Sequence, residues 1–213
     1  MNMVDTSLTN EDTIEETAFE TCTHIKVGVS MSKPFSSFSF LTVINLSYTN
    51  LENGGAIALV NALKNSAPSL QVIEMAGNNI TYEAATAIAV CLAAKRHLKK
   101  LNLSENDLKD EGCVEIVKSM EDWELEYVDM SYNDLRREGA LRLARVVVKK
   151  GSFKMLNIDG NMISLKGIEE IKVIFTNCPK LLGPLDKNVY NVDDDDDLRE
   201  NDEDEFVSVF IFY

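Results

Sequence analysis

The sequence has little of what a metal centre needs. Its four cysteines stand far apart and form no CxxC pair, and its two histidines fall at no metal-ligand spacing. They are Cys22, Cys91, Cys113 and Cys178, with His24 and His97. The sequence therefore predicts no metal site, and nothing in it indicates another cofactor. Cys91 and Cys113 occupy positions that hold alanine elsewhere in the chain, which is typical of small core residues.

Positive charge is also scarce. The chain has 21 Lys and Arg against 35 Asp and Glu, for a net charge of −14. Residues 186–205 hold eleven acids and two bases, and residues 1–40 hold six acids and two bases, so the stretch between them is nearly neutral. Phosphate recognition needs clustered cations, and these are dispersed. The composition therefore argues against nucleic-acid binding.

No apolar run approaches the roughly 20 residues that span a bilayer. The first twenty residues hold six acids, unlike a secretory signal, which combines a basic flank with an apolar core. The eight-residue end FVSVFIFY is too short to span a membrane. These observations predict no membrane insertion and a cytoplasmic protein in a reducing compartment.

What the chain does have is a repeat. One template recurs five times: apolar, two variable, apolar, one variable, apolar, two variable, Asn, one variable, apolar. The copies are LTVINLSYTNL from Leu41, LQVIEMAGNNI from Leu70, LKKLNLSENDL from Leu98, LEYVDMSYNDL from Leu125 and FKMLNIDGNMI from Phe153. Each apolar triplet fits a short strand with alternating faces. Stacked copies would form a parallel sheet.

An asparagine follows the strand in four of the five copies, where the backbone must turn. A buried amide there can satisfy main-chain donors and acceptors of neighbouring turns. The expected asparagine ladder consists of Asn78, Asn106, Asn133 and Asn161, and Thr49 takes the position in the first copy.

A small residue comes four positions after each template, at the entry of an expected helix where the chain must pass close to the strand layer. These residues are Gly55, Ala84, Gly112, Gly139 and Gly167. Apolar residues recur four and eight positions after each small residue, so they lie on one face of the helix. We expect this face to pack under the sheet. A strand and a helix per 27–29 residues indicate an α/β leucine-rich-repeat solenoid: a ribonuclease-inhibitor-like horseshoe with a parallel sheet inside and helices outside.

The pattern divides the chain into three parts. Residues 28–185 form the repeat domain, with a remnant repeat at 28–40 and five repeats at 41–185. Residues 1–27 carry no template and are expected to be a poorly ordered lead. Residues 186–213 are expected to be a disordered acidic tail with a short apolar end. In a solenoid of this kind, each end needs a cover.

Several segments outside the template resemble a particular family. LSYTNLENGGAIALVNALKNSAPSLQVIEMAGNNIT, KKLNLSENDLKDEG, VVVKKGSFKMLNIDGNMIS and a closing LGPLD before an acidic run are similar to plant Ran GTPase-activating proteins. The resemblance covers about residues 28–205. It implies a crescent that binds the small GTPase Ran in its GTP state, with the acidic segment engaging basic surface on the partner.

The resemblance also implies how much the chain would activate the GTPase. This family is thought to order the catalytic glutamine of the GTPase with an asparagine of an early repeat, rather than insert an arginine. The chain resembles the C-terminal half of a family member, so we expect weak or no activation. The Trp-Pro-Pro motif of the plant targeting domain is not found, since the single tryptophan, Trp123, precedes Glu124. Nuclear-envelope or nuclear residence are further expectations of the resemblance.

The inward-facing strand positions are the natural contact surface of such a solenoid. Charged, amide and aromatic groups on this concave face and at its rim are the candidate partner contacts. They are Lys100, Asn102, Glu105, Asp129, Tyr132, Asn157 and Asp159. No nucleophile, base and oxyanion donor converge with them, so no catalytic residue is expected. The chain is expected to be a monomeric regulator, and a generic leucine-rich-repeat module with another partner is the alternative.

Overall fold

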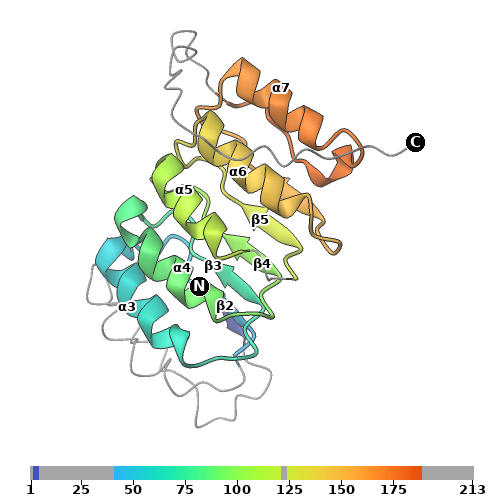
Figure 1. Cartoon of the computed structure of the whole chain (residues 1–213). Helices are drawn as coiled ribbons and strands as arrows, with labels where there is room; N and C mark the ends of the chain where they lie inside the picture. Colours follow the sequence, from blue (N-terminus) through green and yellow to red (C-terminus); the bar gives the residue numbers. More distant parts are fainter. Residues whose placement is uncertain (1, 5–40, 121–123, 189–213) are drawn as a thin grey trace, which may run out of the picture.

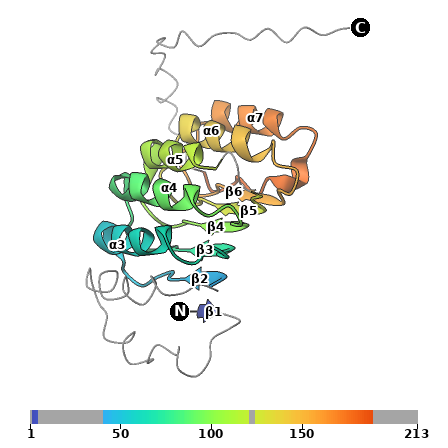
Figure 2. The ribbon, with the colours of Figure 1, turned by 60° about the horizontal axis from the view of Figure 1, so that its bottom comes forward.

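The computed structural model describes residues 2–4, 41–120 and 124–188. The chain coils into a stack in which each complete turn contributes one strand and one helix (Figure 1). In Figure 2 the strands lie along one side of the stack and the helices along the other, in chain order. The expected solenoid is thus confirmed. The proposed remnant repeat at 28–40 lies outside the described residues.

Five strands form the parallel part of the sheet. They are β2 (Val43–Asn45), β3 (Val72–Glu74), β4 (Lys100–Asn102), β5 (Tyr127–Asp129) and β6 (Met155–Asn157). Neighbours pair in chain order, and the second apolar residue of each template stands opposite its counterpart. The strands are only three residues long because the chain turns away at the end of each template.

The helices form the second layer. They are α3 (Glu52–Lys64), α4 (Ala85–Ala93), α5 (Lys109–Lys118), α6 (Arg137–Val147) and α7 (Leu165–Ile174). A 3-10 turn, η1 (Tyr82–Ala84), leads into α4. Each helix packs against the next one along the chain. Each turn of the solenoid is therefore stabilised mainly by its immediate neighbours.

The core lies between the two layers, and the template residues fill it. In the third copy, Leu98, Leu101 and Leu103 are all fully buried. The predicted helical stripe is also buried: the residues four and eight positions after the small residue are at most 1% exposed. They are Leu59, Leu63, Ile88, Leu92, Ile116, Met120, Leu143, Val147, Ile171 and Phe175. The apolar faces of the strands and of the helices are thus buried against each other.

The glycines near the starts of α5 and α6 are required for a different reason from the one expected. A Cβ added to Gly112 would lie 3.1 Å from the Cα of Tyr82, and one on Gly139 would lie 3.1 Å from the Cα of Asp110. Tyr82 and Asp110 belong to the preceding turn of the helical layer. At these two glycines the close approach is therefore between neighbouring helix starts, and the expected approach to the strand layer was wrong there.

Both ends of the sheet carry a cover, and only the one at the N-terminal end differs from expectation. Asn2–Val4 form β1, which pairs antiparallel with β2, although residues 1–27 were expected to be a poorly ordered lead. At the other end, η2 (Pro179–Leu181) leads to a parallel bridge between Leu182 and Leu156. A backbone hydrogen bond from Gly183 to Leu156 (2.8 Å) extends this pairing. A sixth, incomplete turn thus covers β6.

The position of the core predicts which substitutions lower the stability of the fold. Leu101→Ala should lower the free energy of unfolding by about 2–5 kcal/mol, because it removes a fully buried side chain that lies between the layers. Val173→Ala is the control, because Val173 is 72% exposed on α7 and should change stability by less than about 0.5 kcal/mol. Urea unfolding measures both. Equal effects would contradict the assigned core.

Candidate partner-binding surface

The asparagine ladder fixes the turns that follow the strands. Asn133 is fully buried, and its amide nitrogen donates to the carbonyls of Leu103 (2.8 Å) and Ser131 (3.1 Å). Its amide oxygen accepts from the Leu108 N–H at 3.3 Å. One side chain thus satisfies main-chain groups of its own turn and of the preceding one. Each such group would cost about 1–3 kcal/mol if left buried and unpaired.

The other predicted ladder residues act in the same way. Asn78 accepts from the N–H groups of Thr49 and Leu51, Asn106 from those of Asn78 and Ile80, and Asn161 from those of Asn133 and Leu135. The Thr49 hydroxyl donates to the Leu46 carbonyl at 2.7 Å, so it replaces part of the amide's function. All four predicted ladder asparagines thus form hydrogen bonds to the backbone of a neighbouring turn.

The ladder has a fifth asparagine that the sequence reasoning missed. Asn188 is 4% exposed, accepts from the Asn161 N–H at 3.0 Å and donates to the Leu185 carbonyl at 3.0 Å. It stands 27 residues after Asn161, which matches the period, but the acidic composition around it obscured the signal. Residues 186–188 therefore belong to the repeat domain, and the boundary expected at Leu185 was wrong.

The inward face of the sheet carries a row of connected polar side chains on β2, β3 and β4. Asn45 on β2 donates to Glu74 on β3 at 2.6 Å, and the Lys100 ammonium on β4 pairs with Glu74 at 2.5 Å. The Lys100 side chain keeps 43% of its surface exposed. Lys100 is therefore accessible to a partner, as expected, and is held in position by Glu74.

Further along the face, Asp129 and Asn157 are paired. The amide nitrogen of Asn157 donates to Asp129 at 2.9 Å, and the Ser131 hydroxyl donates to the other oxygen of that carboxylate at 2.6 Å. Asn102 on β4 accepts from the Ser104 N–H and hydroxyl in the corresponding way. Asn102, Asp129 and Asn157 are half-buried and form hydrogen bonds at the ends of their strands. They therefore form a fixed polar surface.

Asp159 departs from its expected role as a contact. It is only 7% exposed, and its Oδ1 accepts the Lys187 N–H at 2.8 Å. The incomplete sixth turn therefore covers this carboxylate. Asp159 holds the cover in place, and the sequence reasoning missed this because it ended the repeats before Lys187.

The remaining two candidates, Glu105 and Tyr132, lie at the carboxyl-terminal edge of the sheet, directly before a ladder asparagine. Both are exposed and have positive φ angles of 54° and 53°. Tyr48 holds the same position in the first repeat, and its hydroxyl donates to Glu105 at 2.6 Å. Lys187 holds it in the sixth turn, with its ammonium 5.8 Å from the centre of the Tyr132 ring. The structure thus adds Tyr48 and Lys187 to the candidates.

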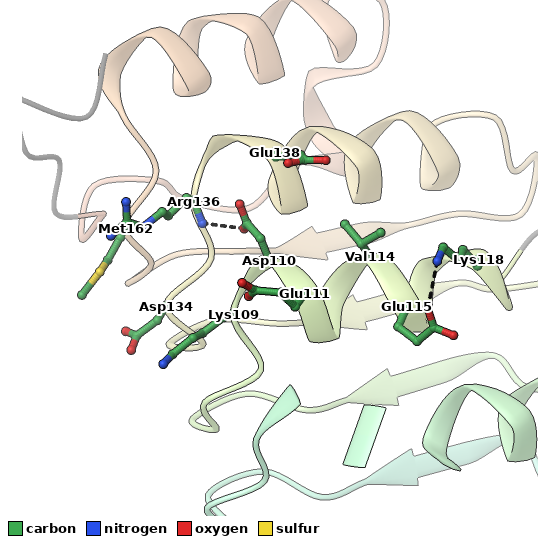
Figure 3. Close-up of a pocket in the computed structure, with 10 residues that line it drawn as sticks. All are labelled: Lys109, Asp110, Glu111, Val114, Glu115, Lys118, Asp134, Arg136, Glu138 and Met162. Carbon is green, nitrogen blue, oxygen red and sulfur yellow. Dashed lines mark hydrogen bonds and ion pairs between the residues drawn. The ribbon is translucent and has the colours of Figure 1, made fainter. Parts of the chain in front are cut away.

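A second accessible feature is a hollow of about 760 Å³ where α5 and α6 begin (Figure 3). Its lining mixes five acids and three bases with Val114 and Met162. Asp110 on α5 accepts the Arg136 N–H at the start of α6 at 2.7 Å. Burial raises the pKa of Asp110, and hydrogen bonds from the Arg136 and Gly139 amides oppose that shift. These contacts join two helices.

The described residues offer little for metal or thiol chemistry. Within them, no group of three or more His, Cys, Asp and Glu side chains could hold a metal ion, and no helix is long and apolar enough to cross a bilayer. Cys91 and Cys113 are buried, as predicted, and burial raises the pKa of Cys91 to about 11. The Cys91 thiol is therefore protonated at neutral pH.

The fold and the repeated motif together define the class of protein. A family model described as "Leucine Rich repeat" matches residues 39–60, 66–89, 94–117 and 125–144. The structure of "Leiomodin-1 Actin-Binding Site 2 (ABS2)" superposes with a TM-score of 0.55 at 16% identity, covering 74% of this chain and 88% of that one. This protein is therefore a leucine-rich-repeat solenoid.

The repeat region has more specific relatives. Over 144 residues, or 67% of this chain, it is 62% identical to RAN GTPase-activating protein 2 of Arabidopsis thaliana. Over 144 residues it is 46% identical to RAN GTPase-activating protein 1 of the same plant. The chain spans 26% and 27% of the length of these two proteins. Its repeats are thus related to those of the plant RAN GTPase-activating proteins, as the motifs predicted.

The ladder predicts a graded loss of stability. Asn133→Ala should lower the free energy of unfolding by about 3 kcal/mol, because it leaves buried main-chain groups unpaired. Asn188→Ala should cost only about 1 kcal/mol, because the last turn has one neighbour and water can replace some bonds.

Asn61→Ala is the matched control, since Asn61 is exposed within α3 and should change stability by less than about 0.5 kcal/mol. Urea unfolding followed by circular dichroism compares the three variants. A loss for Asn133→Ala no larger than that of the control would refute the structural role of the ladder.

Proposed function

We propose that this chain binds a small GTPase of the Ran type in its GTP state, and that it does so as a regulator without a catalytic centre of its own. The observation that carries the proposal is the 62% identity over 144 residues to a RAN GTPase-activating protein. At this identity, repeats of the same period present equivalent surfaces, so a related partner is the first expectation.

The surface supports such a role physically. Lys100 is exposed and oriented by Glu74, Asn157 is bonded to Asp129, and Glu105 and Tyr132 stand at the edge of the same face. Groups that are already held in place lose little conformational freedom on binding. A partner can therefore dock on this face without rearranging it.

The proposal assigns the chain a binding role and little acceleration of hydrolysis. Activators of this kind act on chemistry that occurs within the GTPase, and they contribute positioning and electrostatic stabilisation. The chain spans about a quarter of the length of the two activators that it matches. We expect this chain to bind the GTPase and to enhance its hydrolysis rate only slightly.

The proposal predicts nucleotide-selective binding. The purified chain should bind Ran loaded with a non-hydrolysable GTP analogue at least about tenfold more tightly than Ran loaded with GDP, measured by isothermal titration calorimetry. Lys100→Ala combined with Asn157→Ala should weaken binding about tenfold, because both groups lie on the inward face.

Arg145→Ala is the control, because Arg145 is exposed on α6 in the outer layer and should leave the affinity unchanged. Single-turnover GTP hydrolysis by Ran is measured in parallel and should rise only slightly. Absence of binding, or equal affinity for both nucleotide states, would favour a generic interaction module. Strong acceleration would contradict the limited role proposed for this chain.

The acidic segment predicts a kinetic effect. Residues 189–205 contain ten acids and one base, and they follow directly after the last ladder residue. Removing residues 189–213 should leave the urea midpoint unchanged and slow association with Ran severalfold at low salt, because long-range attraction to basic surface is lost. The difference should shrink near 0.5 M salt, where screening is strong. An unchanged association rate at low salt, measured by stopped flow, would refute electrostatic steering.

A further inference from the structure

The position before each ladder residue forms a regular row along the carboxyl-terminal edge of the sheet. The row is Tyr48, Gly77, Glu105, Tyr132, Gly160 and Lys187. The order is tyrosine, glycine, charged residue, and then the same order again. The first five members all have positive φ angles, between 53° and 69°. The row therefore repeats every three turns of the solenoid.

Each tyrosine lies across the glycine of the next turn. A Cβ added to Gly77 would overlap the Tyr48 ring, and one added to Gly160 would overlap the Tyr132 ring. At a positive φ, glycine is also the residue that the backbone tolerates most easily. Because the glycines have no side chain and tolerate this backbone conformation, an aromatic ring can lie directly against the backbone there.

Each ring then reaches the charged residue two turns further along. The Tyr48 hydroxyl donates to the Glu105 carboxylate at 2.6 Å. The Lys187 ammonium lies 5.8 Å from the centre of the Tyr132 ring. The hydrogen bond to Glu105 raises the pKa of Tyr48, and the neighbouring Tyr132 hydroxyl raises the pKa of Lys187.

The result is an exposed aromatic ridge with two opposite charges. Tyr48 is 65% exposed and Tyr132 is 43% exposed. Glu105 has acceptor capacity beyond one phenol, since a carboxylate offers about four lone-pair sites, and Lys187 has three donors. Strands in a sheet are about 4.8 Å apart, so three steps separate the two charges by roughly 14 Å.

We propose that this ridge is the contact that determines which partner the repeats accept and in which direction it docks. The inference rests on the proposed binding of a Ran-type GTPase. The complementary segment of the partner carries a Lys or Arg opposite Glu105 and an acidic side chain opposite Lys187, with apolar surface over the two rings. Aromatic side chains with few rotatable bonds are effective anchors in such interfaces.

Gly77 and Gly160 are positioning residues in this arrangement. They contact no partner, but each allows its tyrosine to lie flat. A side chain at either position would lift the ring off the surface and separate it from its charged partner. A substitution at either glycine should therefore weaken partner binding by displacing the tyrosine ring.

The test measures the affinity of the full chain for Ran loaded with a non-hydrolysable GTP analogue. Tyr132→Ala and the charge reversal Lys187→Glu should each weaken binding at least about tenfold. Tyr82→Ala removes an equally exposed tyrosine away from the ridge and should change the affinity less than about twofold. Urea unfolding checks that each variant keeps the fold.

A double-mutant cycle tests the positioning role. Gly160→Ala should weaken binding about as much as Tyr132→Ala, and the double variant should be no weaker than either single variant. A merely destabilising effect of Gly160→Ala would instead add to that of Tyr132→Ala.

The outcomes separate the two proposals. If the unmodified chain binds and the ridge variants bind equally well, the ridge inference is overturned while the proposed function stands. If the unmodified chain shows no binding to either nucleotide state of Ran, the proposed function and the inference built on it both fail.

Discussion

The structure depends on one recurring interaction, the hydrogen bonds of a buried asparagine to the backbone of adjacent turns. With strands of only three residues, the sheet alone cannot set the path of the chain after each strand. Asn133 joins the carbonyl of Leu103 in the preceding turn to that of Ser131 in its own. The amide side chain thus sets the distance and direction from one turn to the next, and the leucine core fills the space so defined.

The same interaction links stability to the binding surface. The residue before each ladder position is held at the edge of the sheet, and it is there that Tyr48, Glu105, Tyr132 and Lys187 stand. Positive φ angles at non-glycine residues carry a backbone cost that neighbouring interactions must offset. The ladder supplies those interactions, so contact groups are presented by a rigid framework.

Periodicity predicted what is shared by all turns. The strands, the helices, the core stripes and four ladder asparagines follow from one template, because each must bury the same groups against its neighbours. The periodicity could not predict side-chain contacts that occur in some turns and not in others. The contact between Tyr48 and Glu105 spans 57 positions, and Asp159 is covered by a turn with little of the template. Asn188 was hidden because an acidic composition is typical of solvated tails, although its spacing fitted.

The central claim is that the ladder, rather than strand pairing alone, holds the turns that present the contact surface. Native-state hydrogen exchange of the backbone amides of Ile80, Leu135 and Asn161, all bonded to ladder oxygens, tests it most directly. The account predicts that Leu135 exchanges only through global unfolding and that Asn161, near the end of the stack, exchanges through a smaller opening. Exchange of Leu135 at the rate of an exposed loop amide would contradict it.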